Sequence, residues 1–307
     1  MSDRERPELV SVVIPTYNRA ALIGRAISSA LAQTYENLEI LIVDDGSNDD
    51  TESVVHSFQD ARIRYLRRRD NRGAATSRNE GVEAARGDFV AYLDSDDTWQ
   101  PTKIAQQMAQ VHVCADPGSV VCYSQLTLME GDKARIMPQR GKRSDEPVID
   151  YLLSNEGAIY TPTLLLPRML ARATPFDPKY RVKEDWDVLL RLEDAGASWE
   201  YVPEPLATYH RERSLPRLSG TSTPEENLHW LRAHQSKFSA ATVQRFMLGP
   251  VLQSIIARGE KRRYGVRIVV DALRTGAVKP SEATGLLTDI AFRRFGRNLL
   301  RRLPQRT

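Results

Sequence analysis

The sequence predicts an α/β fold, a mostly parallel sheet flanked by helices, with a helical extension at its C-terminal end. In the first 125 residues, apolar segments rich in Val and Ile alternate with helical segments, and short polar turns separate them. Strands that alternate with helices form parallel sheets, and strands that are apolar throughout are covered on both faces. From about residue 224 onward the pattern is only helical. We therefore expect an α/β domain over residues 1–225 and a basic helical extension over residues 226–307.

The individual elements follow from the same patterns. Strands are predicted over residues 9–14, 38–43, 63–66 and 88–93, and helices over residues 19–33, 50–58, 74–85 and 184–194. The third helix is closed by Arg86 and Gly87, which are typical of a helix C-terminus. Residues 131–148 are predicted to form an exposed basic loop, and residues 210–224 a polar, mobile one.

Composition excludes several classes of protein. The 43 basic and 40 acidic residues give a net charge of +3, which is too small to indicate a nucleic-acid-binding protein. Two cysteines without a CxxC pair indicate neither a disulfide framework nor a structural zinc site. The polar start does not resemble a secretory signal, and no apolar run approaches the ~18 residues that span a bilayer. These features predict a cytoplasmic protein.

Polar clusters directly follow three of the predicted strands, at residues 15–18, 44–47 and 94–97. In open α/β sheets, ligands bind at the carboxyl ends of the strands, where such clusters converge. A single Asp-Gly pair is usually only a turn. Three clusters in order, each after an apolar strand, instead predict a ligand site.

The third cluster contains three carboxylates, Asp94, Asp96 and Asp97. In an extended segment alternate side chains share a face, so Asp94 and Asp96 can point to one ligand. Carboxylates without nearby His or Cys suit a hard cation, Mg²⁺ or Mn²⁺. The alternative is a solvated acidic loop in which Asp97 or Thr98 caps a helix that begins near residue 101.

Residues 10–51 and 69–99 resemble the nucleotide-binding half of the family 2 glycosyltransferases, which have the GT-A fold. The resemblance runs through residues 9–110 and continues more weakly to about residue 210. It implies an inverting transfer of a sugar from a nucleotide-diphosphate-sugar donor to a hydroxyl, assisted by Mn²⁺ or Mg²⁺. The acceptor would be a sugar, a glycolipid or a glycoprotein, in polysaccharide or glycoconjugate assembly.

The resemblance also assigns a donor site. Its residues are Pro15, Thr16, Tyr17, Asp44, Asp45, Gly73, Arg78, Asp94 and Ser95. The first three would line the base pocket, and Asp45, with Asp44 as a second candidate, would accept from a ring N–H of the base. That contact suits uracil or guanine, and we favour a UDP-sugar. Asp94 would face the ribose and the metal and Asp96 would bind the metal, with Asp97 and His210 as weaker metal candidates.

In this family an acidic pair at the start of a helix supplies the general base, and here the pair is Glu184 and Asp185. A sugar hydroxyl becomes a good nucleophile only as its proton is removed, so such a base is needed. We expect Asp185 to be the base, its pKa raised by Glu184 and by burial. Acidic residues also favour a helix N-terminus whatever their chemistry. Trp186 is either an acceptor platform or core, and His210 is either a diphosphate or metal contact or a surface histidine.

The last fifteen residues, 293–307, contain six arginines and no acid, interspersed with apolar residues. This composition fits a helix on an anionic membrane surface, at the inner face of the membrane. It fits equally a solvated basic helix whose leucines pack on the protein.

Two other functions compete with sugar transfer. A sugar nucleotidyltransferase needs a Gly-rich loop after its first strand, and residues 15–20 contain no glycine. A catalytically silent nucleotide-sugar-binding protein would not need the acidic residues Asp45, Asp94, Asp96 and Asp185.

Overall fold

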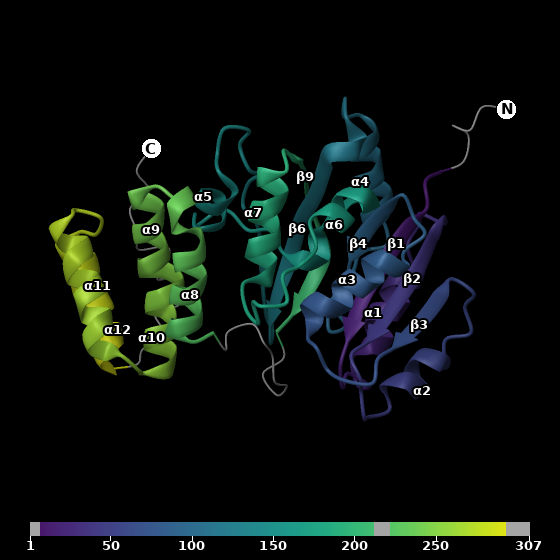
Figure 1. Cartoon of the computed structure of the whole chain (residues 1–307), viewed down its shortest axis with the longest axis horizontal. Coiled ribbons are helices and arrows are strands. Elements are labelled where there is room, and N and C mark those ends of the chain that lie inside the picture. The colour runs from purple at the N-terminus through teal and green to yellow at the C-terminus, as the bar shows by residue number, and fades with distance from the viewer. Residues whose placement is uncertain (1–6, 212–221, 293–307) are drawn as a thin grey trace. The chain divides into compact units, whose positions relative to one another are not determined.

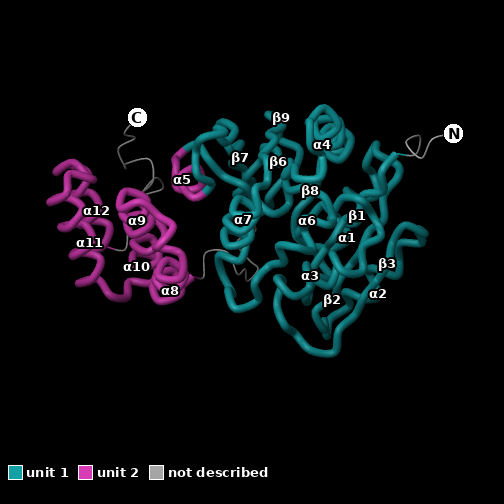
Figure 2. Tube along the Cα trace, turned by 45° about the horizontal axis from the view of Figure 1, so that its top comes forward, with its two compact units in different colours: residues 1–148, 156–215 teal, residues 149–155, 216–307 magenta. Residues whose placement is uncertain are grey.

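The computed structural model describes residues 7–211 and 222–292, and within them two compact units (Figures 1 and 2). The first unit comprises residues 1–148 and 156–215, and the second comprises residues 149–155 and 216–307. The first unit carries every residue predicted for the functional site.

The described part of the first unit contains one nine-stranded sheet, with the order β3-β2-β1-β4-β8-β6-β9-β5 and with β7 paired to β6. The strands are β1 (Val10–Thr16), β2 (Leu38–Asp44), β3 (Ile63–Arg67), β4 (Phe89–Tyr92), β5 (Thr98–Trp99), β6 (Val120–Glu130), β7 (Lys133–Met137), β8 (Leu165–Pro167) and β9 (Ser198–His210). The helices of this unit are α1 (Ile23–Leu31), α2 (Thr51–His56), α3 (Ala74–Ala84), α4 (Lys103–His112), α6 (Arg168–Ala173) and α7 (Glu184–Asp194), with 3₁₀ turns η1 (Pro117–Ser119) and η2 (Thr161–Thr163).

The four strands β3, β2, β1 and β4 are parallel neighbours, which confirms the predicted strand–helix alternation. Thr16 pairs with Asp44 at the ends of β1 and β2, and Val13 pairs with Tyr92 at the end of β4. This register brings the three predicted polar clusters to one edge of the sheet. The second half of the sheet is mixed, because β8 runs antiparallel to both β4 and β6.

Helices cover both faces of the parallel strands. On one face, Val12 and Ile14 of β1 join the core with Ile27 of α1. On the other face Val13 meets α3 so closely that a Cβ on Gly81 would lie 2.3 Å from Val13 Cγ1. Residue 81 is therefore a glycine because the helix backbone lies almost on the sheet. This close contact fixes the position of α3.

Three predicted loop or helix assignments differ from the structure. Residues 131–148 do not form only a loop, because β7 pairs with β6 as an edge strand. Helix α4 begins at Lys103, close to the predicted start near residue 101, but its N-cap is Thr102, so neither Asp97 nor Thr98 caps it. His210 is the last residue of β9 rather than part of a loop, and residues 212–221 of the predicted mobile loop lie outside the described residues.

The second unit is helical. It contains most of α5 (Val148–Leu152), then α8 (Pro224–His234), α9 (Ala240–Phe246), α10 (Leu252–Arg258), α11 (Arg262–Arg274) and α12 (Pro280–Phe292), with a 3₁₀ turn η3 (Gln235–Lys237) and a π-helical turn η4 (Met247–Val251). The ring of Trp230 stacks on Phe246, with centroids 5.2 Å apart, and both are buried. The basic segment 293–307 lies outside the described residues. No helix in the described ranges is long and apolar enough to cross a membrane.

Candidate active site

The loops that follow β1 and β2 are hydrogen-bonded to each other. The backbone N–H of Asn18 donates to Ser47 Oγ at 2.8 Å, and that of Arg19 donates to Thr51 Oγ1 at 3.0 Å. Asn18 has a φ of 50°, which Asn tolerates better than most residues. Tyr17 lies between these contacts and β1, with 41% of its surface exposed. The loop predicted to line the base pocket is thus held in place, while the ring of Tyr17 stays accessible.

The two aspartates that end β2 have different surroundings. Asp44 is fully buried, and its carboxylate accepts hydrogen bonds from the Ser47 backbone N–H at 2.8 Å and from the Tyr65 hydroxyl. This contact and burial raise the pKa of Tyr65 above its usual range. Asp44 therefore serves the fold of the loop, and its carboxylate has no exposed surface for a ligand.

Asp45 instead holds the loop between β3 and α3. Its carboxylate accepts from the backbone N–H groups of Arg72, at 2.9 Å, and Gly73, at 2.6 Å. Gly73 precedes α3 with a φ of 89°, a conformation that suits glycine. The side chain of Arg68 lies beside the same carboxylate, with Nη1 3.5 Å from Oδ1.

Arg78 links the end of β4 to the start of α7. Its Nη2 donates to Asp94 Oδ1 at 2.8 Å, and its Nη1 donates to Glu184 Oε1 at 3.4 Å. The guanidinium is buried and packs 5.1 Å from the ring centroid of Phe176. The two carboxylates raise the pKa of Arg78 further, against the effect of burial. One buried cation thus joins the predicted donor-binding acid to the predicted catalytic pair.

The acidic pair lies in the first turn of α7. Burial, together with the charge of Asp185, raises the pKa of Glu184 to about 7. Asp185 Oδ1 accepts from the Trp186 backbone N–H at 2.9 Å. Lys183 precedes the helix with a φ of 70° and places its ammonium 4.2 Å from the Trp186 ring centroid. Trp186 is half-buried under that ammonium, and burial lowers the pKa of Lys183.

Asp97 has a role that differs from the predicted helix cap. It is buried, and its Oδ1 accepts from the His210 backbone N–H at 3.1 Å. The His210 ring is also held here, with Nε2 3.0 Å from Thr98 Oγ1. Asp97 therefore fixes the end of β9 against the acidic motif. His210 lies beside that motif, as a diphosphate or metal contact would require.

A divalent cation fits these residues only together with a substrate. Among the described residues, no group of three His, Cys, Asp or Glu side chains could hold a metal ion. Asp94 and Asp96 follow β4 and are both partly exposed. Mg²⁺ is commonly bound by one or two carboxylates plus substrate phosphates. The carboxylates of Asp94 and Asp96 match that pattern.

Several buried polar atoms along this edge of the sheet have no hydrogen-bond partner within the described ranges. They are Thr16 Oγ1, Arg68 Nη1 and Nη2, and Arg78 Nε. Buried polar groups in proteins are nearly always satisfied, so these atoms are candidates for contact with a bound polar ligand.

Sequence reasoning missed Arg68 and Phe176, and it gave no role to Lys183, which directly precedes the acidic pair. Arg68 is the second of three consecutive arginines, 67–69, at the end of β3, and this basic run could have marked it. Phe176 lies nearly a hundred residues from Arg78 in the chain, and no local pattern marks it. The positive φ of Lys183 is also invisible in the sequence, because lysine rarely adopts it.

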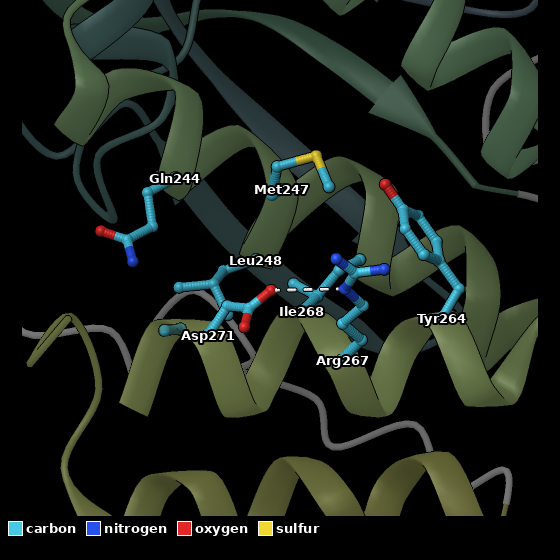
Figure 3. A pocket seen from close by; sticks show the side chains of 8 residues that line it. Gln244, Met247, Leu248, Tyr264, Arg267, Ile268 and Asp271 are labelled. Atoms are coloured by element: carbon cyan, nitrogen blue, oxygen red, sulfur yellow. Dashed lines mark ion pairs between the residues drawn. The ribbon is translucent and has the colours of Figure 1, made fainter. Parts of the chain in front are cut away.

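A separate cavity of about 390 Å³ lies in the second unit (Figure 3). Its lining includes Met247, Leu248 and Ile268, with Arg267 at its edge. The Arg267 Nε lies 3.8 Å from Asp271 Oδ2, and both side chains are largely exposed. None of the predicted site residues lies here.

Comparison with known proteins agrees with this geometry. A model of glycosyl transferase family 2 matches residues 11–165. The amylovoran biosynthesis glycosyltransferase AmsB of Erwinia amylovora is 30% identical over 230 residues, which are 73% of this chain and 76% of AmsB. The Escherichia coli UDP-Glc:alpha-D-GlcNAc-diphosphoundecaprenol beta-1,3-glucosyltransferase WfaP is 45% identical over 101 residues, which are 33% of this chain and only 40% of WfaP.

Two solved structures share the fold. The Staphylococcus aureus protein TarS in complex with UDP-GlcNAc superposes with a TM-score of 0.62 at 19% identity, over 97% of this chain and 93% of the TarS chain. The Pyrobaculum calidifontis mannosyltransferase PcManGT in complex with GDP-Man and Mn²⁺ gives 0.57 at 17% identity, over 94% of this chain and 86% of that chain.

The mostly parallel sheet and these structural neighbours define a GT-A-like fold, which confirms the fold class that the sequence predicted. The matched family model is that of a glycosyltransferase. The chain belongs to glycosyl transferase family 2.

Proposed function

We propose that this chain transfers a sugar, with inversion, from a UDP-sugar to a hydroxyl of a saccharide or glycolipid acceptor in polysaccharide or glycoconjugate assembly. The observation that carries the proposal is Arg78, which bonds Asp94 on the donor side and Glu184 on the acceptor side. The two halves of a transfer site are thereby held together by one buried cation.

The donor nucleotide lies, in this proposal, along the ends of β1, β2 and β4. Tyr17 packs on the nucleotide, Asp45 accepts from a ring N–H of the base, and Thr16 offers its buried hydroxyl, which has no partner among the described residues. Both aspartates already accept hydrogen bonds from the protein, but Asp44 has no exposed surface whereas Asp45 keeps 3%, so Asp45 is assigned the base contact and Asp44 is left out. Asp94 and the neighbouring Ser95 face the ribose and diphosphate, with Gly73 allowing close backbone approach.

Asp185 is the general base of the proposed reaction. Glu184 is held by Arg78, whereas Asp185 uses one carboxylate oxygen for the Trp186 backbone N–H. The acceptor hydroxyl passes its proton to Asp185 as its oxygen attacks the anomeric carbon from the face opposite the diphosphate. Such a base accelerates a reaction by about 10² to 10⁴-fold. The positive charge of Arg78 offsets the repulsion between Asp94 and the acidic pair of α7.

Asp94 and Asp96 would hold Mn²⁺ or Mg²⁺ together with the donor diphosphate. When bound, the ion would neutralise the negative charge that develops on the departing diphosphate. His210, fixed against Thr98, is close enough to the motif to assist in binding the same group.

The relatives support a membrane-linked acceptor and a UDP donor. WfaP is named for UDP-Glc and a GlcNAc-diphosphoundecaprenol acceptor, AmsB for amylovoran biosynthesis, and the TarS crystals contain UDP-GlcNAc. We extend these properties to this chain as a UDP-sugar donor and a saccharide linked to a lipid diphosphate. The same acceptor would place the enzyme at the inner face of the membrane.

Calorimetric titration of the full chain with UDP-, GDP- and dTDP-sugars, each with Mn²⁺ and with EDTA, tests the donor half of this proposal. We expect metal-dependent binding of a UDP-sugar. Absence of a metal-dependent response to every donor would contradict it.

A further inference from the structure

The side chain of Arg68 is buried beside Asp45, and its Nη1 and Nη2 make no hydrogen bond to the described residues. It follows β3, and its backbone N–H donates to the Asp44 carbonyl at 2.9 Å, so it lies next to the end of β2. Nη1 is 3.5 Å from Asp45 Oδ1, and Nε is 3.5 Å from Glu80 Oε2. Only 8% of the side chain is exposed. Nη1 and Nη2 find no hydrogen-bond acceptor in the described part of the chain.

A buried guanidinium with unused donors is costly, because its charge has lost water and gained no hydrogen bond in return. The nearby carboxylate of Asp45 offsets the charge but leaves the N–H groups of Nη1 and Nη2 unused. An acceptor that enters from outside would satisfy them. Arg68 is one of four residues that line a cavity of about 360 Å³, with Gly46, Arg67 and Arg69. A ligand in this cavity meets the Arg68 side chain, which must turn toward the cavity for Nη1 or Nη2 to donate, because both atoms are buried.

The neighbouring charges of Asp45 and Arg68 form a pattern that a nucleobase can match. A carboxylate accepts, and a guanidinium only donates. Uracil presents a ring N–H next to a carbonyl oxygen, and so does guanine. Cytosine and adenine present a bare ring nitrogen next to an amino group, the opposite pattern. The pair therefore suits keto bases and repels amino bases.

We propose that Arg68 determines which base the donor carries, by donating to the carbonyl oxygen adjacent to the ring N–H that Asp45 accepts. The inference rests on the proposed function, since it requires a nucleotide at Asp45. It adds a specificity-determining residue that lies outside the acidic motifs of the family.

Titration of the full chain with UDP, GDP, CDP and ADP in the presence of Mn²⁺ tests this role. We expect UDP or GDP to bind at least tenfold more tightly than CDP and ADP. The comparison of UDP with GDP shows which of the two keto bases the site prefers. Arg68→Gln should weaken the preferred nucleotide by about 10- to 100-fold, the effect of losing a hydrogen bond from a charged group. The affinity for CDP should change less than about threefold, so the ratio of the affinities for the preferred nucleotide and CDP should fall.

Arg67→Gln is the matched control. It removes the same charge from the same cavity, but Arg67 already donates to Glu52 at 2.6 Å and to the Ser47 carbonyl at 3.0 Å. It should leave the UDP to CDP ratio unchanged. Arg68→Lys keeps the charge but not the planar fork, and it replaces Arg68→Gln in the comparison if that variant unfolds below the titration temperature.

The outcomes separate the two proposals. Equal weakening of all four nucleotides by Arg68→Gln, or an unchanged ratio, would overturn the role of Arg68 while leaving nucleotide binding intact. No binding of any nucleotide by the wild-type chain would instead contradict the proposed function itself.

Discussion

Arg78 is the residue on which the proposed site depends most. It is buried between Asp94 and Glu184, and it packs on Phe176. Without it, three carboxylates near the ends of β4 and α7 would repel one another in a poorly solvated place. The resemblance placed Arg78 beside the nucleotide, and its hydrogen bond to Glu184 of the predicted catalytic pair became visible only in the structure.

Two substitutions should separate donor binding from transfer. Asp185→Asn keeps the shape of the side chain but removes the base, so we expect donor affinity to stay within about threefold and turnover to fall by about 10² to 10⁴-fold. Asp96→Ala should instead abolish the metal-dependent part of donor binding. Calorimetry and single-turnover rates measure the two effects, and normal transfer by Asp185→Asn would mean that the base is another residue.

Among helices, α3 is the element that positions the proposed donor site. It begins at the loop held by Asp45, carries Arg78, and lies against β1 at Gly81. The predicted helix over residues 74–85 matched it to within one residue, because its small residues and its Arg-Gly stop are local signals.

Adding one methyl group at Gly81 should therefore damage both fold and site. The Cβ of Gly81→Ala would lie 2.3 Å from Val13 Cγ1, so α3 must move or the variant must store strain, at a cost of about 1–3 kcal/mol of unfolding free energy. The shift would carry Arg78 away from Asp94 and weaken donor binding. Thermal unfolding and UDP titration measure these effects.

Gly24→Ala in α1 is the control for that change. Its Cβ would meet nothing nearer than 3.8 Å, so the substitution should stabilise the helix by about 0.5–1 kcal/mol, as alanine does relative to glycine. Equal melting temperatures for the two variants would show that the contact between α3 and β1 is looser than described.

Helix α4 carries a buried lysine with a measurable pH effect. Lys103 Nζ donates to Gln107 Oε1 at 2.6 Å above the Trp99 ring, and burial lowers its pKa to about 7. Between this value and the ordinary 10.5, the unfolded chain binds a proton that the folded chain does not. The contribution of Lys103 to stability therefore rises with pH across that window.

Lys103→Met should remove this dependence. Urea unfolding at pH 7, 8 and 9 measures the free energy of unfolding of both proteins. We expect that of the wild type to rise relative to that of the variant by up to about 1.4 kcal/mol per pH unit. Parallel pH profiles for the two proteins would show that Lys103 stays charged in the folded state.

At the scale of the whole molecule, the sequence predicted the parallel strands and the clusters at their ends, because both are local patterns of apolar runs and turn residues. It did not predict the pairing of β6 with β9, or the contact between His210 and Asp97, which join distant segments. It also missed β7, whose lysine and arginine make it look like a loop but are typical of an exposed edge strand.

The basic segment 293–307 lies outside the described residues, so membrane binding stays a prediction from composition. Full-length protein should float with liposomes that contain anionic lipid, and a chain ending at residue 292 should not. Since the attraction is electrostatic, salt should release the full-length protein. Equal, salt-insensitive behaviour of the two chains would contradict a tether.

The stereochemistry of donor cleavage tests the central claim most directly. When the enzyme cleaves a UDP-α-sugar with water as acceptor in the presence of Mn²⁺, NMR should show the β-anomer of the free sugar first, before it equilibrates. Inverting transfer with Asp185 as base predicts this β-product, and its loss in EDTA or in Asp185→Asn. An initial α-anomer, or release of a sugar 1-phosphate, would contradict inverting sugar transfer at this site.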